Sequence, residues 1–351
     1  MRSPWKWLSL AVPISLLVAC SDQPSAPKTA QVSPAARASV SAVRVITIKD
    51  LGTLGGATSH AWAINQLGWV AGVSDVRDSV THAFLWRDGK MMDLGTLGGS
   101  SSKALGINDA GDVVGSSQIA GDSAWHAFRW SHGRMTDLGL LGGTYSEGYD
   151  INDAGDVTGY SQGPAWGHAV LFRHGRIVDL GTLGGDLSWA NGIGIGDVVV
   201  GGAFVALDTA QHAFLWRDGV MHDIGTLGGS WAGGSHINVF GAVAGASLLA
   251  DNATMHAFLW QWGRWTDLGD LGGGYSYAQW INDLGQVAGG SYLANGTQHA
   301  VIWDHGATTD LGIFPGGGDG SWAQAINDRG LVVGFALTAA GQPHAAMWVT
   351  R

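Results

Sequence analysis

The stretch that decides the fold is DLGTLGG, at Asp50–Gly56. The same seven letters return at Asp93–Gly99 and at Asp179–Gly185, and near-copies begin at Asp137, Asp223, Asp267 and Asp310. The first Asp of each copy therefore recurs every 42 to 44 residues. Self-similarity at such a period is the signature of a repeat architecture, in which each repeat forms one small structural unit.

Two further motifs run in phase with the first. HAFLW begins at His82, His212 and His256, with relatives at His126, His168, His299 and His344. An Ile-Asn pair begins at Ile64, Ile107, Ile151, Ile237, Ile281 and Ile326. Each repeat reads as four short apolar runs separated by Gly-containing turns, which predicts a four-stranded antiparallel sheet. A period of about 40–45 residues with four strands is typical of a β-propeller blade.

The two ends of the repeat region are complementary. The last repeat stops at His344–Arg351, after its third apolar run, and a lone fourth run stands at Arg44–Gly52, before the first repeat. We therefore predict an all-β, seven-bladed β-propeller whose N-terminal strand pairs with the C-terminal blade and closes the ring. Such closure leaves few unpaired strand edges, whereas an open solenoid would need capping repeats.

The combined pattern of His-Ala-Phe-x-Trp, Asp-Leu-Gly-Thr-Leu-Gly-Gly and Ile-Asn-x-x-Gly-x-Val-x-Gly resembles the bacterial extracellular HAF repeat family. The resemblance spans about Val43 to Arg351 and implies an extracytoplasmic repeat protein, without implying a reaction. The fourth repeat departs from the pattern, because Ile193-Gly194-Ile195-Gly196 replaces Ile-Asn-Asp-x-Gly. We expect a distorted turn there.

The N-terminal segment predicts export. Arg2 and Lys6 precede an apolar run at Leu8–Ala19, which is too short to span a membrane and indicates a signal peptide over residues 1–19. Residues 20–42 are rich in Ser, Ala and Pro, which is typical of a flexible tether. The propeller would then occupy residues 43–351.

Lipid attachment is expected at Cys20. The sequence Leu17-Val18-Ala19-Cys20 resembles the lipobox of bacterial lipoproteins, and the resemblance implies a lipid anchor on Cys20 in the cell envelope. Ser21 resembles the residue that directs lipoproteins to an outer membrane, where the organism has one. The alternative is an ordinary signal peptide followed by a chance Cys.

Composition excludes several classes of function. Cys20 is the only Cys, so a mature lipidated chain has no disulfide, no catalytic thiolate and no Cys-bound metal. The formal net charge is −10 and no basic stripe is present, which argues against nucleic acid as a partner. We expect no cofactor and no bound metal, and we expect a monomer.

The recurring His residues are interpreted as structural. They occur once per repeat, so a ring would hold them far apart, although a His cluster would otherwise suggest metal binding or acid–base work. We expect each His to hydrogen-bond the motif Asp across strands. The Gly pair at Gly98-Gly99 is interpreted as the passage from one blade to the next, and a phosphate-binding loop is disfavoured because no helix or Lys follows.

Candidate binding residues are the positions where the repeats differ, just before the Ile-Asn pair. On a propeller they would form a rim around the central channel, on the face that carries the long loops between second and third strands. The predicted rim residues are His60, Trp62, Glu147, Tyr149, Asp150, Trp189, His236, Tyr277, Trp280 and Trp322. Aromatic faces mixed with polar groups suit sugars or peptide segments.

The leading functional hypothesis is a binding or scaffolding module of the cell envelope that recognises a polysaccharide or an envelope protein. One alternative is a carbohydrate-active hydrolase or lyase that uses Glu147, Asp150, His60 and His236. Glycoside hydrolysis needs two facing carboxylates, and strand alternation places Glu147 and Asp150 on opposite faces, so another blade would have to supply the second. A purely structural envelope protein is the other alternative.

Overall fold

The computed structural model describes residues 45–77 and 80–350. All described residues belong to one compact unit. The predicted signal peptide and the whole predicted tether, including Cys20 as the predicted lipidation site, lie outside the described residues. Within the described ranges, no helix has the length and apolar character needed to cross a bilayer.

The described chain is almost entirely β-structure. The only helical segments within it are two three-residue 3₁₀ turns, η1 (Ile195–Asp197) and η2 (Ala206–Asp208). The strands of the first three repeats are β2 (Ser59–Ile64), β3 (Val70–Arg77), β4 (Val80–Arg87), β5 (Lys90–Asp93), β6 (Gly98–Ile107), β7 (Val113–Ile119), β8 (Trp125–Ser131), β9 (Arg134–Gly139), β10 (Ser146–Ile151), β11 (Val157–Gln162), β12 (Gly167–Arg173) and β13 (Arg176–Asp179).

The strands of the later repeats follow in chain order, and β1 from the start of the chain completes the last sheet. They are β14 (Gly184–Ile193), β15 (Val199–Val205), β16 (Gln211–Arg217), β17 (Val220–Gly225), β18 (Gly228–Ile237), β19 (Val243–Leu249), β20 (Met255–Gln261), β21 (Arg264–Gly269), β22 (Gly272–Ile281), β23 (Val287–Leu293), β24 (Gln298–Asp304), β25 (Ala307–Gly312), β26 (Ser321–Ile326), β27 (Leu331–Leu337), β28 (Pro343–Thr350) and β1 (Val45–Asp50).

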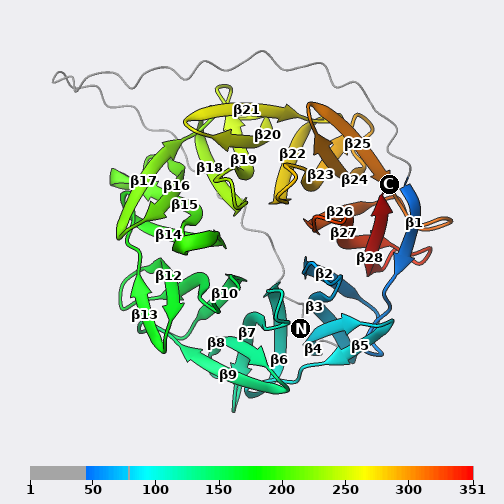
Figure 1. Cartoon of the computed structure of the whole chain (residues 1–351), viewed down its shortest axis with the longest axis horizontal. Helices are drawn as coiled ribbons and strands as arrows, with labels where there is room; N and C mark the ends of the chain where they lie inside the picture. Colours follow the sequence, from blue (N-terminus) through cyan, green and yellow to red (C-terminus); the bar gives the residue numbers. More distant parts are fainter. Residues whose placement is uncertain (1–44, 78–79, 351) are drawn as a thin grey trace. The chain divides into compact units, whose positions relative to one another are not determined.

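Consecutive strands pair antiparallel in groups of four, as the repeat predicts. Four separate four-stranded sheets form in this way, and a twelve-stranded sheet holds β14 to β25. Within the larger sheet, the groups of four strands are joined to one another by the single parallel pairs Gln211↔Trp231 and Met255↔Tyr275. The sheets follow one another around a ring, with β2, β6, β10 and their counterparts innermost (Figure 1). This arrangement is a β-propeller.

The ring closes through the N-terminal strand, as predicted. β1 pairs antiparallel with β28, with Ile48 opposite Trp348. The hydrogen bond from Leu51 N to Ala345 O, at 2.8 Å, extends this pairing beyond the strand end. Closure therefore uses the same backbone ladder that joins third and fourth strands elsewhere in the ring.

The DLGTLGG motif is the passage between neighbouring blades. In the second copy, Asp93 Oδ1 accepts a hydrogen bond from Gly95 N at 2.7 Å, which fixes the turn. Gly95 and Gly98 have φ values of 72° and 104°, a backbone region that side chains with a Cβ rarely adopt. Thr96 Oγ1 donates to Gly99 O at 2.8 Å. The first of these glycines has a positive φ in every copy and the second in most copies, so the motif recurs because most passages use the same two unusual backbone conformations.

A buried Ser then ties each innermost strand except β18, where Ala232 takes its place, to the preceding blade. Ser102 is fully buried, and its Oγ donates to Gly95 O at 2.6 Å. The same Oγ accepts a hydrogen bond from Ala83 N at 2.9 Å, in a third strand of the preceding blade. In the same way, the N–H of the Ala in other HAF-like motifs donates to the Oγ of Ser59, Ser146, Ser188, Ser276 and Ser321.

The hydrophobic core lies between adjacent sheets. One cluster joins Leu85 of β4 to Ile107 of β6 and Phe128 of β8, so it draws on two neighbouring blades. Phe84, Phe128, Phe214 and Phe258 of the HAF-like motifs are all fully buried. Core packing and the Ser bridges therefore act between blades, and they hold the inner strands around the central channel.

Candidate functional site

The His and Asp of the repeat hydrogen-bond each other across the third and fourth strands, as predicted. His126 Nδ1 lies 2.7 Å from Asp137 Oδ2, and the last pair, His344 with Asp50, spans the ring closure at 2.9 Å. The other pairs are His82–Asp93, His168–Asp179, His212–Asp223, His256–Asp267 and His299–Asp310. Since each His has its own Asp, these residues belong to the framework.

The Asn of the Ile-Asn pair connects neighbouring repeats around the channel. Asn327 Nδ2 donates to Asn65 O at 3.0 Å across the ring closure. The other links run from Asn65 to Asn108 O, from Asn108 to Asn152 O, from Asn238 to Asn282 O and from Asn282 to Asn327 O. A second set of bonds runs in parallel, for example from Asp109 N to Asp153 Oδ1 at 3.0 Å. These bonds explain why the pair recurs.

The fourth repeat interrupts this belt of Asn bonds. Gly194 stands in the Asn position and has no side chain to donate, and the expected distortion is present as the 3₁₀ turn η1, where Gly196 and Asp197 have positive φ. Asn152 Nδ2 instead approaches Asp197 Oδ1, at 3.4 Å. The next residue of the motif is Ile195 in the fourth repeat and Val239 in the fifth, which places exposed apolar side chains where other repeats have polar ones.

The turn between first and second strands lies on the face opposite the long loops. Ser100 N donates to Asp122 Oδ1 at 2.7 Å, so the passage between blades and the second-to-third loop share one face. In an antiparallel blade, the Ile-Asn turn and the third-to-fourth turn then share the other face. We call these the loop-rich face and the tight-turn face.

The predicted rim residues do not form an open surface. Glu147, Asp150 and Trp322 are buried. The half-buried ones are His60, Trp62, Tyr149, Trp189, His236, Tyr277 and Trp280. Several pack on each other or on framework aromatics: Trp189 stacks on Tyr160 at 6.2 Å, and His60 meets Phe335 edge-on at 4.9 Å. Packing therefore leaves the predicted rim residues buried or half-buried.

Glu147 belongs to a closed hydrogen-bond network. Its Oε1 lies 2.6 Å from Lys103 Nζ and 3.2 Å from Ser116 Oγ, and its Oε2 accepts from Tyr145 OH at 2.5 Å. Burial and the neighbouring Glu147 carboxylate raise the pKa of Tyr145. The carboxylate is thus fully occupied by protein groups.

Three of the predicted residues line a cavity at the tight-turn mouth of the channel. The cavity has a volume of about 460 Å³, and Asp150, His236 and Trp280 contribute to it together with the Ile-Asn turns. In each innermost strand a register shift occurs just before this position, for example between Gly148 and Asp150. The shift interrupts the strand alternation on which the face assignment of Glu147 and Asp150 relied. Instead, contacts separate them, because Glu147 bonds the preceding repeat and Asp150 the following ones.

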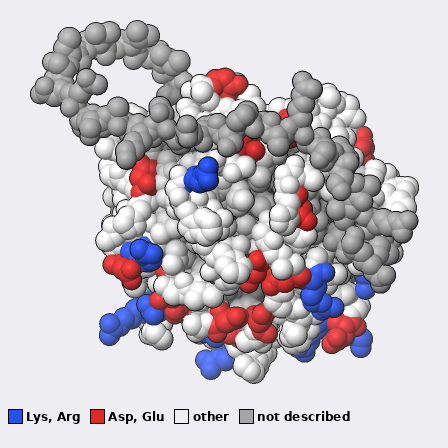
Figure 2. All heavy atoms as spheres, turned by 45° about the horizontal axis from the view of Figure 1, so that its top comes forward, with Lys and Arg blue, Asp and Glu red and all other residues white. Residues whose placement is uncertain are grey.

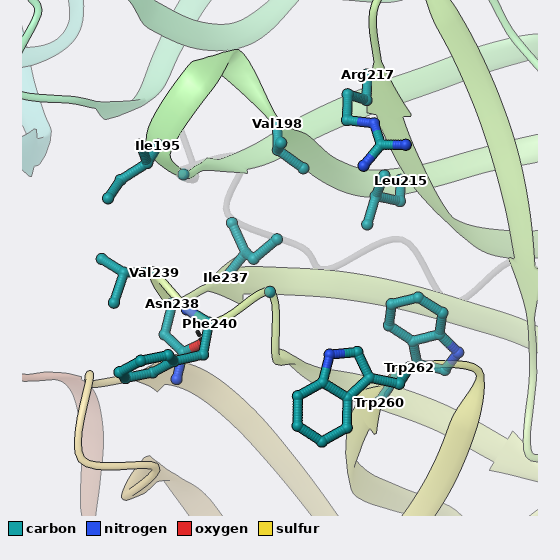
Figure 3. A pocket seen from close by; sticks show the side chains of 12 residues that line it. Ile195, Val198, Leu215, Arg217, Ile237, Asn238, Val239, Phe240, Trp260 and Trp262 are labelled. Carbon is teal, nitrogen blue, oxygen red and sulfur yellow. Dashed lines mark hydrogen bonds between the residues drawn. The ribbon is translucent and has the colours of Figure 1, made fainter.

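A second cavity lies between the fourth and fifth repeats on the tight-turn face. This cleft has a volume of about 310 Å³. Figure 3 shows residues of the fourth repeat along one side and residues of the fifth along the other. Its lining is Gly194, Ile195, Val198, Leu215, Arg217, Ile237, Asn238, Val239, Phe240, Gly241, Trp260 and Trp262. Arg217 is the only cationic side chain among these residues.

Sequence reasoning missed the cleft because it searched the wrong end of the innermost strand. The signal was present in the sequence: Val239 and Trp262 are apolar at turn positions where most other repeats have a polar residue. Trp262 is 81% exposed and Phe240 is 63% exposed. Exposed large apolar side chains gathered in one place indicate an interaction site.

Charge is sparse on the surface. Charged residues make up only 13% of the chain, and most of the surface seen in Figure 2 carries neither sign. Among the residues that the structure describes, no group of three or more His, Cys, Asp or Glu side chains is arranged to hold a metal ion.

Comparison with known proteins supports the fold alone. The β-propeller domain of the Trilobed protease of Pyrococcus furiosus superposes with a TM-score of 0.55 and 10% identity, over 83% of this chain and 95% of that one. A gluconolactonase of Xanthomonas campestris gives 0.41 and 11%, over 91% and 98%. An acylaminoacyl peptidase of Pyrococcus horikoshii gives 0.49 and 12%, over 78% of this chain and 50% of that chain.

The family assignment made from the sequence is wrong on these comparisons. No family model matches the chain, so the resemblance to the HAF repeat family does not stand. No curated protein matches it either. The similarity that remains is one of architecture, to β-propellers.

Proposed function

We propose that this protein is a binding module whose partner docks in the cleft between the fourth and fifth repeats. The observation that carries the proposal is the exposure of Trp262, Phe240 and Ile195 around a cleft of about 310 Å³ on a rigid ring. Water-exposed apolar side chains cost free energy unless a partner covers them, about 25 cal/mol per Å² of apolar area.

The chemistry of the cleft favours a protein segment over a sugar. Sugars need several hydrogen-bonding groups beside an aromatic face, and among the twelve lining residues only Asn238 and Arg217 have polar side chains. A bulky apolar side chain of a peptide fits this lining better. Arg217 at the edge suits an acidic residue next to that side chain. The proposed partner is therefore a peptide segment with an aromatic anchor and an adjacent carboxylate.

The test is a binding titration with peptides that carry Phe or Trp next to Asp or Glu. We expect saturable binding that is lost in Trp262→Ala and weakened in Arg217→Gln. Trp166→Ala is the matched control, because Trp166 is also an exposed Trp (54%) but lies in a second-to-third loop. Equal loss in both Trp variants would contradict the proposal. Saturable polysaccharide binding that Trp189→Ala abolishes would return the site to the loop-rich face.

The glycosidase alternative has no support from the predicted carboxylates. Lys103, Ser116 and Tyr145 occupy Glu147, and Asp150 lies among different partners in the following repeats. Neither arrangement leaves two free carboxylates facing one another, as that chemistry requires.

We count the ring as seven blades. The support is the grouping of antiparallel pairs into fours, with the twelve-stranded sheet treated as three blades linked by two single residue pairs. A medium-resolution electron-density map of the purified protein, viewed along the ring axis, would test the count.

We further propose that the module acts at the cell envelope, anchored through Cys20. The support is the sequence Leu17-Val18-Ala19-Cys20 after a short apolar run. Mass spectrometry of the mature N-terminus should find an acylated Cys20, and Cys20→Ala should move the protein from the membrane to the soluble fraction. An unmodified Cys20 in membrane-free material would contradict the anchor.

A further inference from the structure

The channel cavity holds a group of buried and half-buried polar side chains that the proposed docking cleft does not use. Asp150 of β10, His236 of β18 and Trp280 of β22 all stand one residue before the Ile of their repeats. They come from three different blades and line the same cavity of about 460 Å³. Most repeats have Ala or Gly at this position, so these side chains are not required by the framework.

Asp150 is a buried acid without a cationic partner. It is 3% exposed, and its two oxygens accept hydrogen bonds from Ile151 N at 2.8 Å and Ile193 N at 3.0 Å. Among the described residues, no Lys or Arg pairs with it, and none lines the cavity. Burial raises the pKa of Asp150 to about 7, because the two backbone hydrogen bonds compensate only part of the lost hydration.

His236 presents a hydrogen-bond acceptor beside this acid. Its Nδ1 lies 3.1 Å from Ile281 O, so Nδ1 carries the proton, and its ring stacks on Trp280 at 3.6 Å. Burial lowers the pKa of His236 to about 3, which keeps the ring neutral at physiological pH and leaves Nε2 as an acceptor. Nε2 lies 3.7 Å from Asp150 Oδ2, beyond hydrogen-bond distance.

The result is two acceptors side by side with no donor between them. A neutral hydroxyl would satisfy one of them and leave the carboxylate charge uncompensated. An ammonium group has three N–H donors and a positive charge, so it can bond both Asp150 and Nε2 of His236.

Acidic side chains give the mouth of the cavity the negative charge that an ammonium ligand needs. Asp109, Asp153, Asp283 and Asp328 stand around it. Each accepts one backbone hydrogen bond through Oδ1, as Asp328 does from Asp283 N at 2.8 Å. Burial and the nearby Asp283 and Asp109 carboxylates raise the pKa of Asp328. These residues attract cations toward the opening, and the buried pair at its floor provides the specific contacts.

We propose that the channel cavity binds the ammonium group of an organic amine, held between the carboxylate of Asp150 and Nε2 of His236. The amine is a small alkyl amine or diamine, because the cavity is polar at its mouth and at its floor. The channel cavity borders the docking cleft, and Asn238 and Val239 are among the residues that line both. The contacts that carry the two proposals differ, because Asp150 and His236 line only the channel cavity and Trp262 lines only the cleft. Either proposal can therefore fail without the other.

Amine binding should depend on pH in a defined direction. The ligand pairs with ionised Asp150, so its affinity should be highest above pH 7 and fall about tenfold per unit below it, as the carboxyl takes up a proton. His236 does not titrate in this range, and protonation of the mouth residue Asp328 would act in the same direction. Binding at pH 7 should also release about half a proton per amine, since Asp150 is about half protonated there.

The experiment is calorimetric titration of the purified protein with 1,4-diaminobutane at pH 8, with 1,4-butanediol as the neutral isostere. We expect the diamine to bind and the diol not to bind. Asp150→Asn should weaken binding at least tenfold, Asp283→Asn less than threefold, and Asp122→Asn on the loop-rich face not at all. The number of protons released at pH 7 comes from repeating the titration in buffers of different ionisation enthalpy.

Three results would overturn the proposal. The first is binding of the diol as strongly as the diamine. The second is an Asp283→Asn effect as large as that of Asp150→Asn, which would reduce the site to surface acidity. The third is the absence of proton release at pH 7, which the native protein reports even if Asp150→Asn fails to fold.

Discussion

The buried Ser that bridges most of the passages between blades predicts a large loss of stability when its single oxygen atom is removed. In Ser102→Ala, Ala83 N–H loses its acceptor and Gly95 C=O loses its donor. Ala83 is fully buried, so water cannot replace the lost acceptor of its N–H. An unsatisfied buried group costs about 1–3 kcal/mol.

We expect Ser102→Ala to lower the free energy of unfolding by about 3 kcal/mol. Ala83 N–H contributes the full penalty for an unsatisfied buried donor, about 2 kcal/mol. Gly95 is half-buried, so solvent replaces part of its lost bond and it adds about 1 kcal/mol. No large cavity term arises, because the change removes one oxygen and leaves Cβ in place.

Equilibrium unfolding in urea, followed by Trp fluorescence, measures this difference. The control is Ser100→Ala, which removes an exposed Oγ bonded to Gln118 and Asp122 and should cost within about 0.5 kcal/mol. The reasoning fails if Ser102→Ala costs less than about 1 kcal/mol with an unchanged urea dependence, or if the two variants are alike.

Further predictions follow from other repeated residues. Burial lowers the pKa of His256, but the hydrogen bond and charge of Asp267 outweigh burial and raise that pKa. The His256–Asp267 pair therefore stabilises the folded state fully below about pH 6.5, and this stabilisation is lost as pH rises through the folded-state pKa. In urea titrations, Asp267→Asn should lower the free energy of unfolding more at pH 5.5 than at pH 8.5. Gly115→Ala should prevent folding, because the new Cβ would lie 1.9 Å from Lys103 O. Gly133 lies in an open turn with a φ of 82°, so Gly133→Ala should lower the free energy of unfolding by only about 1 kcal/mol. Soluble yield and Tm distinguish the two variants. Asn327→Asp keeps the side-chain oxygen but loses the donor to Asn65 O, and should cost about 2 kcal/mol in the same unfolding assay; a wild-type value would show that the Asn bonds at ring closure carry no stability.

The repeat allowed the sheets, their order and the closing strand to be predicted from the sequence. A motif residue that recurs in every repeat answers a need that every repeat shares, so the His–Asp pairs and the Gly passages could be interpreted without coordinates. Gly98 and Gly99 are required for different reasons. Gly98 has a positive φ, whereas a Cβ at Gly99 would lie 2.6 Å from Ile119 O.

The candidate site could not be predicted in the same way. Variation was treated as a sign of exposure, but Trp322 varies and is buried. The register shift before Asp150 also interrupts strand alternation, and no single letter marks it. Asp150 and His236 are 86 positions apart in the sequence and lie near one another only through the curvature of the ring, which local sequence patterns do not encode. Interruption of the Asn motif at Gly194 was the more reliable guide, because loss of a framework bond needs a reason.

The closing strand pair has a consequence for where the chain can begin and end. Val45 is paired with Thr350, so the two ends of the described chain lie side by side in one sheet. A short linker could join them, and new ends could be opened at the exposed turn around His132-Gly133 without cutting a strand. Such a circular permutant would close its ring by the β8–β9 pairing in place of β28–β1. If closure through one strand pair is all that the ring requires, the choice of which blade is shared between the two ends is arbitrary.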